Sequence, residues 1–302
     1  MIHLFLLNMF YIICQVKSLK TYTGDVIRIV DGIKHKQLGY GDIVVSELGI
    51  GTQRWCSEDF NSPNEELCHQ FLDRSVLNSG VNFIDTAEQY PIPSSRSKPE
   101  GLVETVIGNW LAKDKSRRQK LVISTKITGG RNVNKRNIVA DCDGSLARLK
   151  TDYIDVYMLH WPARYSPQSN WGQSLQYNHE SEKYYDGNAS FEEIVKSMGD
   201  LIKAGKIRGY GFCNDNTFGL TACAYIAKSM NLPPPVAMQN DYSLINRRIE
   251  ENGLSEASRY VCVCVCFFIR KVKCITTIIV YYKLFIISVP FISTLVSWPI
   301  MH

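Results

Sequence analysis

The sequence predicts an α/β fold, a barrel of the TIM or (β/α)8 type. Its 302 residues, 45% of them apolar, suffice for one barrel domain with a large core. Short apolar runs that suit buried parallel strands alternate six times with segments of helical periodicity. Three of these runs end in an ionisable residue, namely Asp85, Lys126 and His160. Because such a barrel carries its chemistry at the carboxyl ends of its strands, we expect these three side chains at one face.

Charge and cysteine content favour a cytoplasmic protein that does not bind nucleic acid. Six of the 34 basic residues lie in the acid-free stretches 1–20 and 260–302, which leaves 28 basic against 29 acidic residues between them. This near-neutral middle lacks the basic footprint of a nucleic-acid-binding protein. Four of the ten cysteines lie in residues 260–302, and the other six contain no C-x-x-C pair. We therefore expect reduced cytosolic thiols and no metal site.

Residues 1–34 are expected to form an apolar leader and a linker. Residues 1–16 are apolar but lack the basic start of a signal peptide, so a signal or anchor segment is an alternative to a non-native leader. The domain is expected to begin at residue 35. Tyr40-Gly41-Asp42, between apolar alternations, predicts a hairpin turn, and Leu48 to Thr52 is expected to be the first barrel strand.

Helices and strands then alternate along the chain. A helix is expected from an N-cap at Ser62, with Pro63 at its first position and Glu65 three residues after the cap. Gly80 ends it before the next strand. The following elements are the strand 81–85, an amphipathic helix over 99–113, the strand 121–126, a helix with an apolar stripe over 138–149, and the strand 154–160.

The second half of the predicted domain opens with the long aromatic loop 161–189. Loops of this length are often functional, so we expect a lid or a substrate wall, with a disordered insertion as the alternative. Ser190 and Glu193 form a capping box for a helix that ends at Gly205. The remaining elements are the strand 207–214, a helix over 217–230 and a sixth strand over 236–240.

Several segments resemble, in the right order, the motifs of the aldo-keto reductase family and its Tas-like branch. They lie between residues 35 and 259 and read V-S-E-L-G-I-G-T, F-I-D-T-A-E-Q-Y-P, G-N-W-L-A-K, S-T-K, R-L-K-T-D-Y-I-D-V-Y-M-L-H-W-P, A-G-K-I-R-G-Y-G-F-C-N and Q-N-D-Y-S-L-I-N-R. The resemblance implies an NADP(H)-dependent oxidoreductase that reduces an aldehyde or ketone, a small-molecule carbonyl substrate, to an alcohol. It also implies a catalytic tetrad of Asp85, Tyr90, Lys126 and His160.

The tetrad suits the chemistry that the resemblance implies. Hydride delivered to a carbonyl carbon leaves negative charge on oxygen, and a proton must meet it. A nearby Lys126 ammonium eases proton release from the Tyr90 phenol. Asp85 would hold Lys126, and His160 would orient the carbonyl oxygen. Taken singly, these residues are also compatible with a structural ion pair, a loop tyrosine and a core histidine.

The resemblance also implies cofactor and substrate contacts. Asn214 and Gln239 match the residues that hold the nicotinamide carboxamide, and Cys213 stands where the family has serine. Thr52 matches a cofactor contact, and Trp55 and Trp161 are substrate-wall candidates. Trp55 as a core aromatic is the alternative.

After residue 259 the family pattern ends, so we expect a barrel truncated after its sixth strand and a non-family hydrophobic tail over 260–302. Alternating Val-Cys is what an in-frame GT repeat encodes, so the tail is interpreted as translated intron. One alternative is a membrane segment over 284–301, which would make the protein membrane-associated. Another is that Val261 to Ile269 takes the place of the seventh strand. The missing phosphate grip predicts weak NADPH binding, and a non-enzymatic nucleotide-binding or scaffold protein is the alternative function.

Overall fold

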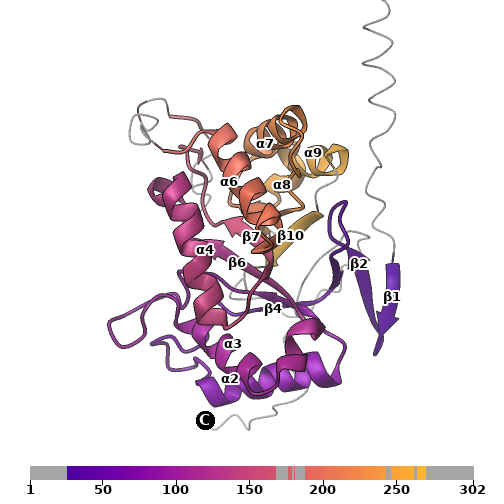
Figure 1. Ribbon diagram of the computed structural model, residues 1–302, viewed down its shortest axis with the longest axis vertical. Coiled ribbons are helices and arrows are strands. Elements are labelled where there is room, and N and C mark those ends of the chain that lie inside the picture. The colour runs from indigo at the N-terminus through magenta and orange to yellow at the C-terminus, as the bar shows by residue number, and fades with distance from the viewer. Residues whose placement is uncertain are drawn as a thin grey trace, which may run out of the picture.

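The central element of the computed structural model is a seven-stranded sheet whose neighbouring strands are all parallel (Figure 1). The structure describes residues 26–167, 176–178, 180, 188–242, 246–261 and 264–269. The strands follow one another in chain order across the sheet, and β4 and β10 form its two edges. They are β4 (Gly49–Gly51), β5 (Phe83–Asp85), β6 (Val122–Ile127), β7 (Ile154–Leu159), β8 (Ile207–Cys213), β9 (Ala237–Tyr242) and β10 (Cys264–Ile269).

The six strands expected from the sequence are all present, and the predicted fold, a TIM-type barrel that is incomplete, is confirmed. Every residue of β6 and β7 is buried, as the uninterrupted apolar runs predict for parallel strands covered on both faces. In addition, β10 pairs with β9 from Cys264 opposite Ala237 to Ile269 opposite Tyr242. A strand therefore does follow β9 in the seventh position, which is one of the alternatives that the sequence leaves open for this segment.

The long helices connect successive strands and pack on the outer face of the sheet (Figure 1). Ser190 caps α6 as predicted and accepts a hydrogen bond from the Glu193 amide. The predicted cap at Ser62 is wrong, because the Asn64 side chain accepts from the Leu67 amide and so occupies the N-cap position. The helices are α2 (Glu65–Leu72, continued by a π turn, Asp73–Leu77), α3 (Leu102–Ala112), α4 (Lys135–Leu149), α6 (Phe191–Lys203), α7 (Thr217–Ser229), α8 (Arg248–Glu251) and α9 (Leu254–Tyr260).

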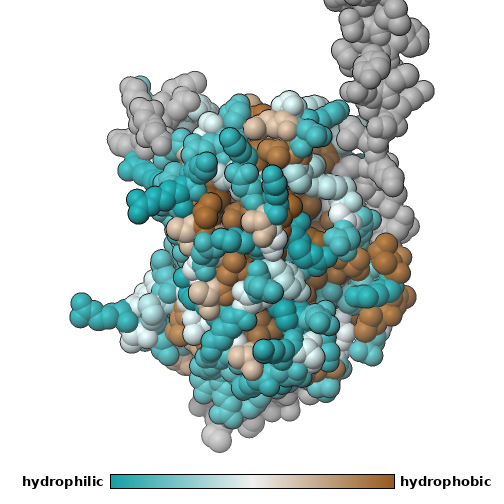
Figure 2. All heavy atoms as spheres, in the orientation of Figure 1, coloured by the Kyte–Doolittle hydropathy of each residue, from teal (hydrophilic) through white to brown (hydrophobic). Residues whose placement is uncertain are grey.

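A small antiparallel sheet precedes the barrel strands. It contains β1 (Val26–Val30), β2 (Ile33–Gln37) and β3 (Val44–Ser46), and the predicted turn at 40–42 joins the last two. The segment 26–34, expected to be linker, instead forms β1 and a tight turn in which Asp31 and Gly32 both have positive φ. The outer strand exposes apolar side chains at the side of the molecule (Figure 2), namely Val26, Ile27 and Ile29.

Two apolar clusters bury opposite faces of the large sheet. The larger one, the outer apolar cluster, fills the space between the sheet and the helices. The smaller one, the inner cluster, joins Leu38, Ile43 and Val45 of the β2–β3 hairpin region to side chains from the other face of the strands, among them Phe83 and Val122. The hairpin thus covers the amino-terminal end of the sheet's inner face. The polar side chains lie at the carboxyl ends of the strands.

The predictions for the two ends of the chain lie outside the described residues. Neither the apolar leader 1–16 nor the tail 270–302 is described, so the intron and membrane interpretations stay predictions. Among the helices of the described ranges, none has both the length and the apolar content needed to cross a bilayer.

Candidate active site

Asp85, Lys126 and His160 meet at the carboxyl ends of three neighbouring strands. Asp85 ends β5, Lys126 lies near the end of β6, and His160 directly follows β7. Side chains alternate between the two faces of a strand. Two residues before Asp85, Phe83 belongs to the inner cluster, and Met158 has the same relation to His160. The three side chains therefore project from the inner face of the sheet.

The Lys126 ammonium is fully buried and held by two acceptors. Its Nζ donates to Asp85 Oδ1 at 2.7 Å and to the carbonyl oxygen of Thr86 at 2.8 Å. Burial opposes the charge of Lys126, but the negative groups around it outweigh this effect and raise the pKa of Lys126 above its ordinary value. The site therefore keeps a permanent positive charge with no direct contact with water.

Tyr90 comes to this cation from the loop after β5. Lys126 Nζ lies 5.3 Å from the centroid of the Tyr90 ring, and the His160 ring packs edge-on against the same ring at 5.6 Å. The Tyr90 carbonyl oxygen accepts from the Gly101 amide at 3.1 Å, which anchors the loop to the start of α3. The structure thus brings together all four residues of the expected tetrad.

The electrostatics of the tetrad keep the phenol and the imidazole neutral. Burial raises the pKa of Tyr90 above its ordinary value, and the Lys126 ammonium acts in the opposite direction. Burial, with repulsion from Lys126, holds the pKa of His160 well below its usual range. Among the residues that the structure describes, His160 Nδ1 has no hydrogen-bond partner although it is buried. The site therefore contains a protonated phenol and a neutral imidazole beside one ammonium.

Cys213, Asn214 and Gln239 form a second polar group next to the tetrad. The Cys213 thiol donates to Gln239 Oε1 at 3.3 Å, and Asn214 Nδ2 donates to the His160 carbonyl oxygen at 2.9 Å. Burial raises the pKa of the Cys213 thiol to about 12, so it stays protonated at neutral pH. This thiol and the two amides are the residues that could hold the carboxamide of a nicotinamide.

The other three candidates have different surroundings. The Thr52 hydroxyl donates to the Asp85 carbonyl oxygen at 2.9 Å, so it supports the strand end of the tetrad. Trp55 is buried within the outer apolar cluster. The Trp161 ring stacks on His160 at 6.0 Å with an interplanar angle of 22°. The roles of Thr52, Trp55 and Trp161 in binding stay predictions.

Sequence reasoning missed a network of charged residues behind the tetrad, on the helix side of β6. Glu104 is fully buried in α3 and bonds both Arg148 of α4 and Thr125 of β6. A signal was present, because Glu104 stands among the buried apolar positions 103, 106, 107 and 110 of its helix. A carboxylate there needs a buried partner.

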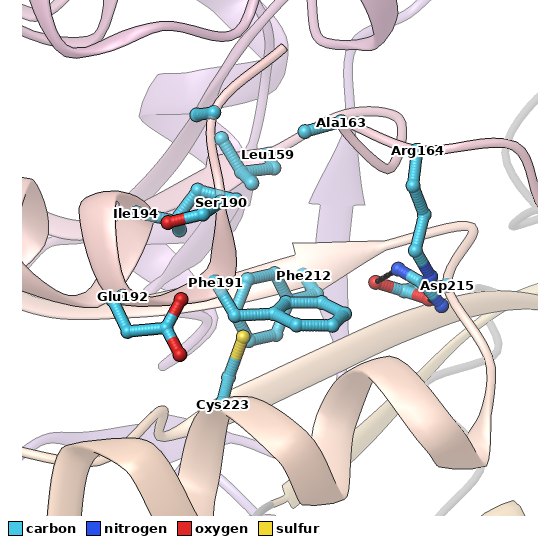
Figure 3. A pocket seen from close by; sticks show the side chains of 11 residues that line it. Leu159, Ala163, Arg164, Ser190, Phe191, Glu192, Ile194, Phe212, Asp215 and Cys223 are labelled. Carbon is cyan, nitrogen blue, oxygen red and sulfur yellow. Dashed lines mark hydrogen bonds and ion pairs between the residues drawn. The ribbon is translucent and has the colours of Figure 1, made fainter. Parts of the chain in front are cut away.

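A hollow of about 220 Å³ lies outside the tetrad (Figure 3). Its walls include Leu159, Phe191 and Phe212, and the Arg164 guanidinium pairs with both carboxylate oxygens of Asp215 at one side. Part of the predicted lid, with Trp171, Tyr184 and Tyr185, lies outside the described residues. The lid stays a prediction.

Comparison with known proteins gives concordant matches. The family model described as "Aldo/keto reductase family" matches residues 47–261. The chain is 37% identical to "Protein tas" of Escherichia coli over 242 residues, which covers 76% of this chain and 65% of that protein. It is 34% identical to an "Aldo-keto reductase" of Babesia bovis over 152 residues, 46% of this chain and 53% of that one. The chain thus spans a little under two thirds of the Escherichia coli protein.

Among solved structures, the chain is similar to a thermostable aldo-keto reductase crystallised with the inhibitor epalrestat. The TM-score is 0.57 at 25% identity, and the match covers 77% of this chain and 71% of that one.

Proposed function

The chain belongs to the aldo/keto reductase family, and we propose that it is an oxidoreductase that reduces an aldehyde or ketone to an alcohol with NADPH. In this proposal Tyr90 is the general acid. The observation that carries it is the buried Lys126 ammonium, which Asp85 holds at 2.7 Å and which lies 5.3 Å from the Tyr90 ring. A buried ammonium this close to a phenol favours the phenolate, which supports proton donation by Tyr90.

The proton donor works through a balance of burial and charge. Burial keeps the proton on Tyr90 until a stronger base is present, since it raises the pKa of the phenol. As a carbonyl carbon gains hydride, its oxygen becomes such a base. Lys126 then stabilises the phenolate that remains on Tyr90. General acid catalysis of this kind contributes about 10²- to 10⁴-fold.

His160 would orient the carbonyl oxygen. Its imidazole is neutral because burial and Lys126 lower its pKa, so it carries one N–H donor and one acceptor nitrogen. A neutral donor fixes the oxygen in place without competing with Tyr90 to protonate it.

The residues present fit a nicotinamide carboxamide. Asn214 and Gln239 offer amide donors and acceptors next to the tetrad, and Cys213 offers a protonated thiol. When bound, NADPH supplies the hydride. The chain's own part is to hold the carboxamide group and to keep the ammonium and the phenol beside it.

A non-enzymatic nucleotide-binding or scaffold protein is the second candidate. It is favoured by the sheet, whose edge strands β4 and β10 are not paired with each other in the described part of the chain. An unclosed sheet leaves the loops at its carboxyl end less constrained. Such a protein would bind NADPH without consuming it.

We also propose that the protein is cytoplasmic and that no nucleic acid is among its partners. The five cysteines that the structure describes with their side chains are free and buried, as expected in a reducing compartment. Cell fractionation tests the location, and release by a carbonate wash separates it from an anchor in residues 260–302.

The activity test follows NADPH consumption with 4-nitrobenzaldehyde. We expect turnover by the wild-type chain and a loss of at least about 100-fold in kcat for Tyr90→Phe. Tyr210→Phe is the matched control, because it also removes a buried hydroxyl, one with no hydrogen-bond partner among the described residues. Turnover unchanged in Tyr90→Phe would refute the acid assignment, and NADPH binding without turnover would favour the scaffold alternative.

A further inference from the structure

Arg148, on α4, joins two carboxylates that belong to different parts of the site. Its Nε donates to Glu104 Oε2 at 2.7 Å, and its Nη2 lies 3.7 Å from Glu88 Oε1. Glu104 lies on α3, and Glu88 lies two residues before Tyr90 on the loop after β5. One guanidinium thus contacts both the loop of the proton donor and the helix that follows it.

The backbone around Arg148 is shaped to admit its side chain. A Cβ at Gly101 would lie 2.6 Å from Arg148 Cδ, and one at Gly144 would lie 3.1 Å from its Nη1. Gly101 has a φ of +81° and donates its amide proton to the Tyr90 carbonyl oxygen at 3.1 Å. Arg148 therefore packs directly against the residue that anchors the backbone of Tyr90.

From Glu104 the contacts continue to the strand that carries Lys126. Glu104 Oε1 accepts from the Thr125 hydroxyl at 2.5 Å, and Thr125 directly precedes Lys126 in β6. Because side chains alternate along a strand, Thr125 faces the helices while Lys126 faces the tetrad. Fixing Thr125 from behind fixes the direction in which Lys126 projects.

Glu88 makes a parallel connection. Its Oε2 accepts from both the amide and the hydroxyl of Thr128 at 3.1 Å, and its own amide donates to the Lys126 carbonyl oxygen at 3.0 Å. Arg148 thus lies where the contacts from the Tyr90 loop and from β6 converge.

We propose that Arg148 is a positioning residue that, through Glu88, Glu104 and Gly101, fixes the separation between Tyr90 and Lys126. The proposal rests on the proposed function, in which that separation sets the rate of proton donation. A misplacement of about 1 Å in an active site can cost about 100-fold in rate.

The charges around Arg148 explain why a cation is needed there. Glu88, Glu104 and Asp141 surround it, and the Tyr157 hydroxyl lies among the same groups without a hydrogen-bond partner in the described part of the chain. Burial raises the pKa of both Glu88 and Asp141, and Arg148 acts against this rise. Without the guanidinium, the carboxylates would repel one another and push the Tyr90 loop away from α3 and α4.

The test variant is Arg148→Met/Glu104→Gln. Neutralising Glu104 together with Arg148 avoids leaving the fully buried Glu104 carboxylate unpaired, which would destabilise the fold by itself. The matched control is Arg118→Met/Asp155→Asn, which removes another buried pair, joined at 2.7 Å, at the opposite end of β7 from His160. The full-length chain is used throughout, with NADPH and 4-nitrobenzaldehyde as probes.

We expect the Arg148 variant to lose about 10- to 100-fold in kcat, with the KM for NADPH within about threefold of wild type. Its pH–kcat profile should move to higher pH, because a displaced Lys126 lowers the pKa of Tyr90 less. The control should lose stability but keep kcat and the profile. If the Arg148 variant also keeps both, Arg148 is only structural and the proposal fails.

Hydrogen exchange separates this outcome from a failure of the proposed function. Peptides that cover residues 85–101 and 122–128 should exchange faster in the Arg148 variant than in wild type and in the control. If the wild-type chain shows no turnover but the Arg148 variant shows this faster exchange, the reductase function is refuted and the structural role of Arg148 is supported. Unchanged exchange in both peptides would overturn the proposal that Arg148 positions the Tyr90 loop and β6, whatever the activity.

Discussion

Replacing Asp85 by asparagine tests whether the buried ion pair of the tetrad is as coupled as its geometry indicates. The substitution keeps the size of the side chain and an oxygen that can accept from Lys126, but it removes the negative charge. Lys126 would keep the Thr86 carbonyl oxygen at 2.8 Å as its other acceptor. The change therefore isolates the charge of Asp85.

The magnitude follows from the burial of the pair. Lys126 is fully buried and Asp85 is 6% exposed, with 2.7 Å between Nζ and Oδ1. Two charges about 4 Å apart attract by about 4 kcal/mol at an effective dielectric constant of about 20. Breaking a buried pair by removing one partner costs about 3–5 kcal/mol. We expect Asp85→Asn to lower the free energy of unfolding by that amount at neutral pH.

The loss of unfolding free energy in Asp85→Asn should also depend on pH, and its direction follows from the difference in proton binding between the folded and unfolded chains. Without Asp85, burial should lower the pKa of Lys126 in the folded chain, whereas a lysine in the unfolded chain has a pKa of about 10.4. Between these two values the unfolded chain binds more protons, so stability rises with pH. The deficit relative to wild type should therefore shrink from pH about 6 to pH about 9.

Urea unfolding at several pH values measures both effects, with Asp85→Asn/Lys126→Met as the control. The double variant replaces the pair by neutral groups and should recover most of the loss without the pH dependence. A loss below about 1 kcal/mol for Asp85→Asn, or one that is equal at every pH, would refute the reasoning, because it would mean that Lys126 reaches water.

Two further predictions concern neighbouring groups. Cys213→Ser replaces the thiol, a weak donor to Gln239, by a hydroxyl. A stronger hydrogen bond to the carboxamide, worth about 0.5–1.5 kcal/mol, should lower the dissociation constant of NADPH by about 2- to 10-fold in a fluorescence titration. Weaker binding would contradict the assignment of Cys213 to the carboxamide. His160 has a pKa held well below its usual range, so below pH about 6.5 the unfolded chain binds a proton that the folded chain does not. As the pH falls below that value, the free energy of unfolding of wild type should decrease by up to about 1.4 kcal/mol per pH unit relative to that of His160→Asn, measured by urea unfolding. Parallel pH curves for the two proteins would refute this prediction.

Much of the fold, and the grouping of three of the four tetrad residues, follow from the strand and helix pattern alone, whereas Tyr90 was expected only from the family resemblance. Apolar runs of strand length, each followed by a helical stripe, leave few arrangements other than a parallel sheet covered by helices. The period of two along a strand also places Asp85 on the same face as Phe83. Parallel strands align their carboxyl ends, so local patterns sufficed to bring Asp85, Lys126 and His160 together.

Other features depended on contacts that no local pattern encodes. The sequence shows Tyr90 as a loop residue, and its place beside Lys126 depends on the Gly101 amide and the packing of α3. The β1–β2 turn was missed because Asp31-Gly32 lies in a segment interpreted as linker.

The partners of Glu104 lie 21 and 44 residues away, on β6 and α4. Periodicity assigns a residue to a face, but it does not say which side chain of another element lies opposite. The sequence by itself determined the six strands β4 to β9, the helices between them and the face of the sheet on which the chemistry lies. Only the tertiary structure decided which charges neutralise one another, because the cost of burying an ion depends on partners that folding brings within about 3 Å.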